Sequence, residues 1–401
     1  MKIAQIEVVP LRCEYPEGQG FKFAGGYCNG RLSCLVLVHL DDGTVGVGSV
    51  YSHPGLVTSI VEGHLQPMLV GRDPLQVEEI WNLCYRLTRW YGRKGAALSA
   101  LGGIDTALWD IRGKAADKPV CELLGATRKK VPVYASALLW KDNPKELADE
   151  AERHLDFGFR GMKTRLGRNY DYDREAVAIV RKTIGTGNRL LVEGNARYSL
   201  AQAERIAADY RAADVFWFEE PFPPEQIDDF LALRASVGIP LASGENEFGV
   251  QGFRELLDQA LVDIVQPDCS RSGGITECFR IGKLASERGV RVATHSWSDA
   301  AALVANIHLI AALPTGLTVE MDRTGNPLID ELLTEPLKIV DGQVAVPEGP
   351  GLGIRLDSSA VERFRMPRLA TPPNGNYSDM VFGSEYFRPA PGYEAVEVRV
   401  G

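Results

Sequence analysis

The sequence lacks the features that mark secreted, membrane-bound or nucleic-acid-binding proteins. Its seven cysteines are scattered, odd in number and never spaced Cys-x-x-Cys, a usage that indicates reduced thiols and not a disulfide framework or a zinc site. No apolar run approaches the length of a membrane span, and the N-terminus has no apolar signal core. The net charge is −9 without a basic stripe, which argues against a nucleic-acid surface. We therefore expect a cytoplasmic protein with no membrane and no nucleic-acid partner.

The composition is that of a globular protein with room for two domains. The 401 residues are 45% hydrophobic and 24% charged, and a chain of this length can bury more than one core. Residues 1–128 carry strand patterns, a glycine-rich loop at 17–30 and two helical patterns, which predict an α+β domain. The segment 336–401 begins with a hairpin pattern, which predicts a return to the first domain, and has a proline-rich extension from about 366.

Strand and helix patterns alternate between residues 129 and 335. Eight apolar strand patterns are separated by seven helical ones, in units of roughly 25 residues. This alternation predicts a parallel sheet, and a closed barrel explains eight strands better than an open sheet does. The expected strands are 131–138, 161–166, 189–195, 214–221, 240–246, 262–268, 290–296 and 317–322.

Every predicted barrel strand after the first ends in an ionisable residue. The five in the middle of the series are 23 to 27 residues apart, which is one for each strand–helix unit. In a parallel barrel the C-terminal ends of the strands open onto one face, where active sites are built. We therefore expect one site there, formed by Lys163, Glu193, Glu219, Glu245, Asp268, His295 and Glu320.

Glu193, Glu219 and Glu245 end three consecutive predicted strands. Clustered carboxylates repel one another, and the pKa of each rises unless a cation joins them. Mg²⁺ accepts a few carboxylate oxygens and keeps positions open for water or substrate. Zinc is disfavoured because none of the three positions is His or Cys. The sequence therefore predicts a Mg²⁺ site.

Asp268 and His295 end the next two predicted strands. A carboxylate beside an imidazole accepts a hydrogen bond from one ring nitrogen, which fixes the tautomer and raises the pKa of the ring; this is the arrangement of an oriented general base. Lys163 and Arg165 alternate along one strand and should therefore point to the same side. We expect these four residues to lie in the same site as the metal.

Six stretches, found in order along the chain, carry a resemblance to a known family. They are "GFRGMKTRLG", "VEGN", "WFEEP", "SGEN", "VQPD…GGITE" and "THSW". With them the chain resembles the mandelate racemase/muconate lactonizing enzyme branch of the enolase superfamily over residues 1–365. The resemblance implies an α/β fold: a modified TIM barrel of (β/α)7β form with an α+β N-terminal capping domain.

The same resemblance implies roles for the residues named above. It implies Mg²⁺ on the three glutamates, a base dyad of His295 and Asp268, and Glu320 as a further active-site acid. Lys163 would help the metal to stabilise the enediolate that forms when a proton α to a carboxylate is removed. The C-terminal stretch resembles that of sugar-acid enzymes of this branch, which implies a small-molecule carboxylate, a sugar acid, as substrate. The family resemblance also implies a homo-oligomer.

Two positions depart from the family pattern. Glu193 occupies a position where the branch usually has Asp, which is a conservative change. Arg165 replaces the second lysine of a Lys-x-Lys motif, an acid/base that relatives keep on the face of the substrate opposite the histidine. Arginine stays protonated in proteins and suits a bidentate carboxylate clamp. Because racemisation needs two bases and elimination can proceed with one, Arg165 favours elimination.

The favoured function is a Mg²⁺-dependent dehydratase that converts an aldonic or aldaric acid to a 2-keto-3-deoxy acid. His295 is expected to remove the α-proton and then to protonate the departing β-hydroxyl. The alternatives are a sugar-lactone cycloisomerase of the galactarolactone type, a racemase or epimerase of a 2-hydroxy acid, and an inactive sugar-acid-binding barrel. Six residues are predicted to contact the substrate: Tyr51, His53, Asn195, Arg197, Asn246 and Trp297.

Overall fold

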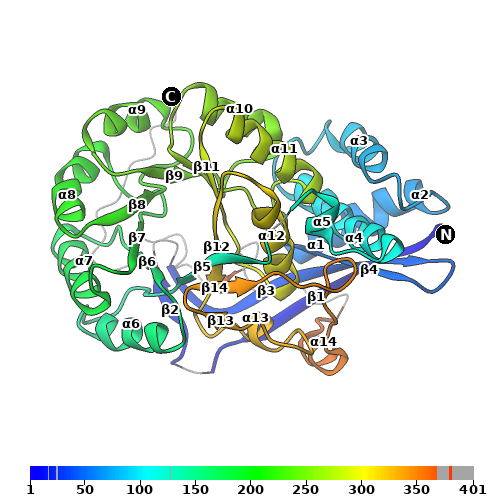
Figure 1. Ribbon diagram of the computed structural model, residues 1–401, viewed down its shortest axis with the longest axis horizontal. Helices are drawn as coiled ribbons and strands as arrows, with labels where there is room; N and C mark the ends of the chain where they lie inside the picture. The colour runs from blue at the N-terminus through cyan, green and yellow to red at the C-terminus, as the bar shows by residue number, and fades with distance from the viewer. Residues whose placement is uncertain (17, 24–25, 127, 368–378, 382–401) are drawn as a thin grey trace.

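The computed structural model describes residues 1–16, 18–23, 26–126, 128–367 and 379–381. They form a barrel of parallel strands ringed by helices and, beside it, an antiparallel sheet with helices of its own (Figure 1). The predicted fold class, a modified TIM barrel with an α+β capping domain, is confirmed. The predicted domain boundaries at residues 128 and 335 stay predictions.

The barrel has eight parallel strands, all within residues 128–367. Each strand pairs with the next along the chain, and β12 pairs with β5, which closes the sheet. One helix follows each of the first seven strands, so the order is (β/α)7β. The strands are β5 (Lys130–Ser136), β6 (Gly161–Arg165), β7 (Arg189–Glu193), β8 (Val215–Glu219), β9 (Leu241–Ser243), β10 (Ile264–Val265), β11 (Arg291–Thr294) and β12 (Gly316–Asp322). The helices are α6 (Glu146–Asp156), α7 (Tyr170–Ile184), α8 (Leu200–Ala212), α9 (Ile227–Ser236), α10 (Gly249–Asp258), α11 (Gly274–Glu287) and α12 (Ala300–Ala312).

Polar caps fix where several barrel helices begin. The side chains of Asn169 and Asp299 accept hydrogen bonds from backbone N–H groups in the first turns of α7 and α12. Ser199 and Gln202 form a capping box at the start of α8. Such caps satisfy N–H groups that have no partner within the helix. Because each cap follows a strand end, it also fixes the length of the loop on the C-terminal face of the barrel.

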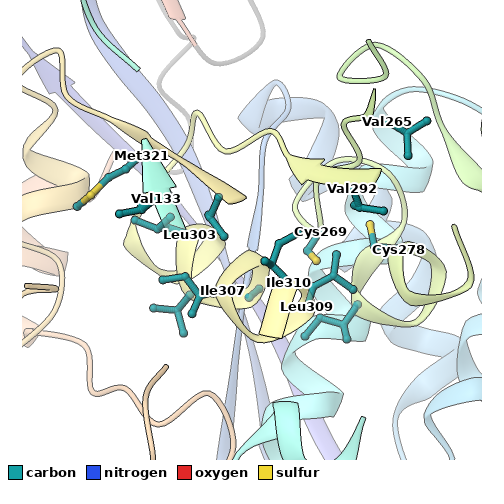
Figure 2. Close-up of a cluster of buried hydrophobic side chains, with 14 of the residues drawn as sticks. Val133, Val265, Cys269, Cys278, Val292, Leu303, Ile307, Leu309, Ile310 and Met321 are labelled. Atoms are coloured by element: carbon teal, nitrogen blue, oxygen red, sulfur yellow. The ribbon is translucent and has the colours of Figure 1, made fainter. Parts of the chain in front are cut away.

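Helix α12 is apolar almost all round and buried along its length. A helix of this kind has to be covered on every side, and α12 contacts β5, β11 and β12 of the barrel as well as the N-terminal domain. Figure 2 shows Leu303, Ile307 and Ile310 of α12 among Val133 of β5 and Val292 of β11. The helix is therefore held firmly between the two parts of the molecule.

The capping domain is built on three long antiparallel strands. In this sheet β3 (Gly26–Leu40) lies between β1 (Ile3–Glu14) and β4 (Val45–Val50), and α4 (Ala96–Ala116) packs against β3 and β4. The approach is close, because a Cβ on Gly48 would lie 2.0 Å from the carbonyl oxygen of Gly103. The other helices of this domain are α1 (Pro54–Ile60), the π-helix η1 (Val61–Leu65), α2 (Gln66–Leu69), α3 (Val77–Thr88) and α5 (Val120–Leu123).

The glycine-rich stretch 17–30, expected to be a loop, contains strands in its described residues. Here β2 (Phe21–Phe23) pairs antiparallel with the start of β3. Lys22 also forms a backbone bridge with Trp140 of the barrel domain, and its ammonium group lies 2.9 Å from Asp142. Strand propensity depends strongly on context, so pairing with neighbours outweighs the weak propensity of glycine. The result is a hairpin that lies against a barrel loop.

The segment after the barrel first stays on the barrel and then reaches the capping domain. The hairpin of β13 (Ile339–Val340) and β14 (Gln343–Ala345) pairs with β5. After α13 (Pro327–Asp330) and this hairpin, α14 (Ser358–Phe364) contacts β1, and β15 (Asp379–Val381) pairs with β3. The rest of the proline-rich extension, 368–378 and 382–401, lies outside the described residues.

All seven cysteines are buried and none is in a disulfide. This agrees with the prediction of reduced thiols. Among the helices in the described part of the chain, none is both long enough and apolar enough to cross a membrane.

A buried carboxyl group joins the capping domain to the barrel. Asp105 of α4 accepts hydrogen bonds from the backbone N–H of Thr276 at 2.8 Å and from its hydroxyl at 2.6 Å, at the start of α11. Trp109, one turn further along α4, donates to the same hydroxyl at 2.8 Å. Burial raises the pKa of Asp105 to about 7 even though the two bonds from Thr276 lower it.

The raised pKa of Asp105 makes the stability of the protein depend on pH. Between pH ~4 and ~7 the unfolded chain releases this proton while the folded protein keeps it, so the contribution of Asp105 is largest below pH 4 and is lost as the pH rises to 7. The free energy of unfolding should therefore fall by up to about 4 kcal/mol across this window because of Asp105, and we expect Asp105→Asn to remove this dependence on pH. Urea unfolding of both proteins at several pH values measures it. Parallel stability curves would contradict the assignment.

Candidate active site

The C-terminal ends of the barrel strands bring the predicted site residues together. Lys163 and Arg165 lie in β6, Glu193 and Glu219 end β7 and β8, and Glu320 lies in β12. Glu245, Asp268 and His295 follow β9, β10 and β11. All of these side chains are buried except that of Glu245, which is 14% exposed. The predicted clustering of these residues is thus observed; their roles are taken up under Proposed function.

Lys163 lies at the centre of the carboxylates. Its ammonium nitrogen is 2.6 Å from Glu193 Oε2, 2.5 Å from Glu219 Oε1 and 2.9 Å from Glu320 Oε1. Burial alone would lower the pKa of Lys163, but Glu219 and Glu320 outweigh it and raise this pKa above its ordinary value. Lys163 is therefore a fixed positive charge at the floor of the site.

Arg165 points to the same place as Lys163, as alternation along the strand predicted. Its guanidinium group forms an ion pair with Glu193 and lies 3.7 Å from Glu320 and 3.3 Å from the hydroxyl of Ser136. The guanidinium carbon also lies 4.6 Å from the centre of the Trp297 ring. These contacts hold Arg165 as a charged group, and no part of them equips it to accept a proton.

Three carboxylates lie close enough to share one cation. Oxygens of Glu193, Glu219 and Glu245 all lie within 4.8 Å of one another. Glu193 accepts a hydrogen bond from Asn195, and Glu219 accepts one from Trp217 at 2.9 Å. Within the described residues, the buried Oε2 of Glu245 has no hydrogen-bond donor.

The charge balance of the site also favours a bound cation. Five carboxylates, those of Glu193, Glu219, Glu245, Asp268 and Glu320, face two cationic side chains and one imidazole. Burying unbalanced charge is costly. The all-carboxylate donor set and its excess of negative charge fit a hard divalent cation such as Mg²⁺.

His295 and Asp268 form the predicted hydrogen-bonded pair. His295 Nδ1 lies 2.8 Å from Asp268 Oδ2, and its Nε2 lies 3.9 Å from Glu245 Oε2. Burial lowers the pKa of His295, but Glu245 and Asp268 outweigh it and raise this pKa to about 9. Because the Asp268 carboxylate accepts a bond from Nδ1–H, Nε2 is the nitrogen that faces the carboxylate cluster and can exchange a proton.

Glu320 is held as a carboxylate. Burial alone would raise its pKa, but Lys163, His295 and Arg165 lower it to about 2. Its second oxygen accepts a hydrogen bond from the backbone N–H of Ser296 at 2.9 Å. At neutral pH Glu320 therefore supplies a negative charge beside Lys163.

Three of the predicted substrate contacts reach the site. The ring of Tyr51 lies 5.5 Å from that of His295, and Trp297 packs against Arg165. Asn195 donates to Glu193. All three thus lie against charged residues of the site, and their contact with a substrate stays a prediction.

The other three have different surroundings. His53 caps α1, where its Nδ1 accepts a hydrogen bond from Gly55 N–H at 3.2 Å. Asn246 donates to Glu220 and accepts from Arg271, both at 2.9 Å. Arg197 lines a cavity of about 80 Å³ between the starts of α7 and α8, to which none of the five site carboxylates contributes. Substrate contact by these residues also stays a prediction.

Sequence reasoning overlooked two charged residues near the site. Glu220 is buried directly after Glu219, with a backbone φ of +37°, and burial raises its pKa to about 8, helped by the negative charges of Glu245 and Glu219. Arg271 lies over the ring of Tyr51. The second glutamate of "WFEEP" was a visible signal for Glu220, whereas Arg271 lies in a loop whose direction the sequence does not reveal.

A capped (β/α)7β barrel with clustered carboxylates and a His–Asp pair at its C-terminal face defines an enolase-like protein. Residues 146–360 match the family described as enolase C-terminal domain-like. Residues 21–125 match the N-terminal domain of the mandelate racemase/muconate lactonizing enzyme family. The protein therefore belongs to the mandelate racemase/muconate lactonizing enzyme family of the enolase superfamily.

Similar proteins include enzymes of two kinds and a metal-bound structure. D-galactarolactone cycloisomerase of Agrobacterium fabrum is 37% identical over 350 residues, which span 84% of this chain and 92% of that protein. Arabinonate dehydratase of Saccharolobus solfataricus is 31% identical over 333 residues, 82% of this chain and 89% of that one. The crystal structure of a racemase from Streptomyces coelicolor A3(2) with bound magnesium superposes with a TM-score of 0.84 at 26% identity, covering 91% of this chain and 100% of the other.

Proposed function

We propose that this protein is a Mg²⁺-dependent dehydratase that converts an aldonic or aldaric acid to a 2-keto-3-deoxy acid. One observation carries the proposal: a single oriented base, His295, and a permanently charged Arg165 border the same buried carboxylate cluster. The relative that is an arabinonate dehydratase supports a sugar acid as the substrate.

Each charged residue has a task in this reaction. In the neutral form of His295, Nε2 takes the proton α to the substrate carboxylate, and Asp268 stabilises the imidazolium that results. The imidazolium then gives its proton to the departing β-hydroxyl, and the enol product tautomerises to the keto acid. Lys163 is a preorganised positive charge near the substrate carboxylate, where negative charge develops. Mg²⁺ held by Glu193, Glu219 and Glu245 would supply further positive charge to that carboxylate.

Arg165 is the reason to prefer elimination over racemisation. A racemase moves a proton between two faces of one carbon and needs a base at each. Arg165 stays protonated, and its ion pairs with Glu193 and Glu320 hold its charge in place. Its fork of N–H groups suits a substrate carboxylate.

A second candidate function is the cycloisomerisation of a sugar lactone. The relative from Agrobacterium fabrum, 37% identical, is a D-galactarolactone cycloisomerase. Its reaction class needs the same first step, because loss of the α-proton allows a β C–O bond to break, here within the ring. The group that leaves in this reaction is a carboxylate, which needs no proton. His295 would therefore act only as the base, whereas dehydration also needs it as the acid.

A screen of acids and lactones separates these functions. We would incubate the protein with mono- and diacid sugars and their lactones, after chelation and again with Mg²⁺, and record product masses. A dehydratase product lacks the mass of one water, whereas a cycloisomerase product keeps the mass of its substrate. In D₂O a racemase would introduce α-deuterium without elimination. A thermal shift with substrate and Mg²⁺ but no product of any kind would indicate a binding protein and contradict the proposal.

We further propose a cytoplasmic homo-oligomer without nucleic-acid or membrane partners. The seven buried cysteines, none of which is in a disulfide, support a reducing compartment. The negative net charge of −9 disfavours nucleic acid. Light scattering of the purified protein tests the oligomeric state.

A further inference from the structure

A fully buried amide on α12 contacts both members of the His–Asp pair. Asn306 Nδ2 donates to Asp268 Oδ1 and to the backbone carbonyl of His295, both at 3.1 Å. Its Oδ1 accepts a hydrogen bond from the backbone N–H of Cys269 at 3.0 Å. These three bonds use both N–H groups and the oxygen of the amide, so its orientation is determined. Asn306 thus links the end of β10 to the end of β11.

The bond to Asp268 completes the set of donors on one carboxylate oxygen. Oδ1 of Asp268 accepts from the backbone N–H of Ser270 at 2.8 Å, from the Ser270 hydroxyl at 2.7 Å and from Asn306. Oδ2 is left to His295. Donors to a carboxylate favour its charged form, and here they also stop the group from rotating. The imidazole therefore meets an acceptor with one fixed direction.

Asn306 can hold this geometry because its own helix is fixed. Leu303, Ile307 and Ile310 pack α12 against the barrel (Figure 2), and Asp299 caps its first turn. A well-packed core does not deform continuously. The helix therefore fixes the backbone of Asn306, and the three hydrogen bonds of the amide fix its side chain.

We propose that Asn306 is a positioning residue for the His295–Asp268 pair. It acts through Asp268 and the backbone of His295, and it lies outside the group of residues that face the substrate. This inference rests on the proposed function, since it assigns Asn306 to the base of that reaction. Outer partners of metal-bound histidines typically change metal affinity or activity by about 10–100-fold when removed, and we expect an effect of the same size for this histidine.

The chain offers a matched control on the same helix. His308 is fully buried two residues from Asn306; its Nδ1 accepts from Cys121 N–H at 3.2 Å and its Nε2 lies 3.1 Å from the carbonyl oxygen of Leu352. His308→Ala removes two buried hydrogen bonds from α12, as Asn306→Ala removes three, but it does so on the side of the capping domain. A purely structural role for Asn306 predicts similar effects of the two substitutions.

The first measurement compares kcat and KM of Asn306→Ala, His308→Ala and the wild-type protein, well below their unfolding temperatures. We expect Asn306→Ala to lower kcat by about 10–100-fold with KM changed by less than about threefold. His308→Ala should lose stability but keep kcat within about twofold. If the two variants lower kcat equally, or if Asn306→Ala keeps wild-type kcat, the inference is overturned.

A second measurement needs no turnover. In protein labelled with ¹⁵N-histidine, the Nδ1–H signal of His295 is identified by its loss in His295→Asn. We expect Asn306→Ala to shift or broaden this signal and His308→Ala to leave it unchanged. An unchanged signal in Asn306→Ala would overturn the inference even if the wild-type protein proves to have the proposed activity. A shifted signal in a protein that converts no sugar acid or lactone would instead support the positioning and reject the proposed function.

Discussion

His295→Asn should lower the kcat of elimination by about 10²–10⁴-fold, the usual contribution of a positioned general base. The amide of asparagine can still donate to Asp268 across the 2.8 Å contact that Nδ1 now occupies, but it has no group that accepts a proton at neutral pH. Exchange of the α-proton with D₂O should fall by the same factor, because both reactions share the first step. Rapid-quench or steady-state assays with mass detection measure the two rates together.

The outcome for His295 separates two mechanisms. If exchange persists at the wild-type rate in His295→Asn while elimination stops, another group takes the proton and His295 serves only as the acid for the leaving group. If both reactions continue at the wild-type rate, the single-base mechanism is wrong. Tyr51→Phe is a suitable control: it keeps the ring that packs 5.5 Å from the imidazole and tests whether a neighbouring hydroxyl contributes.

Lys163→Met should damage both activity and stability. The ammonium group lies 2.5–2.9 Å from three buried carboxylates, and its removal leaves Glu193, Glu219 and Glu320 with less compensation. Removing one partner from a buried ion pair typically costs about 3–5 kcal/mol, and the loss of one preorganised charge lowers kcat by about 10²–10³-fold. Urea unfolding without Mg²⁺ and turnover with Mg²⁺ measure the two effects.

An exposed lysine provides the comparison for Lys163. Lys22 forms an ion pair with Asp142 at 2.9 Å, but both side chains are more than half exposed, so solvent screens the pair. Lys22→Met should therefore change the free energy of unfolding by less than about 1 kcal/mol. Equal losses in the two variants would show that the carboxylate cluster does not depend on the Lys163 charge for its stability.

The barrel and its carboxylate cluster could be predicted because both depend on repeated local patterns. Apolar strands alternate with helices, and an ionisable residue lies at the end of each strand after the first, so the pleat and the parallel order bring Glu193, Glu219 and Glu245 to one face. The prediction did not depend on the path of any loop. Alternation within β6 placed Lys163 and Arg165 together for the same reason.

The parts that escaped prediction depend on contacts between segments far apart in the sequence. In the glycine-rich stretch 17–30, β2 pairs with the start of β3, and Lys22 also forms a backbone bridge with Trp140 of the barrel domain, a partner that the local sequence does not reveal. The directions of Arg197 and Arg271 are set by the loops that carry them. Asn306 lies in an apolar helix that reads simply as a core element, and only the packed structure shows that it reaches Asp268.

The seven buried cysteines can report local or global opening of the folded protein, because a thiol reagent reaches them only when the structure around them opens. A thiol reagent meets no cysteine on the described surface of the folded chain, and burial raises the pKa of Cys13 to about 11, so even this thiol is mostly in its unreactive form. Because Cys13 and Cys34 lie in the capping sheet and Cys269 and Cys278 beside α12, the order in which they are labelled reports which part of the molecule opens first. Mass spectrometry of labelled peptides would then follow the separation of cap from barrel without any engineered reporter.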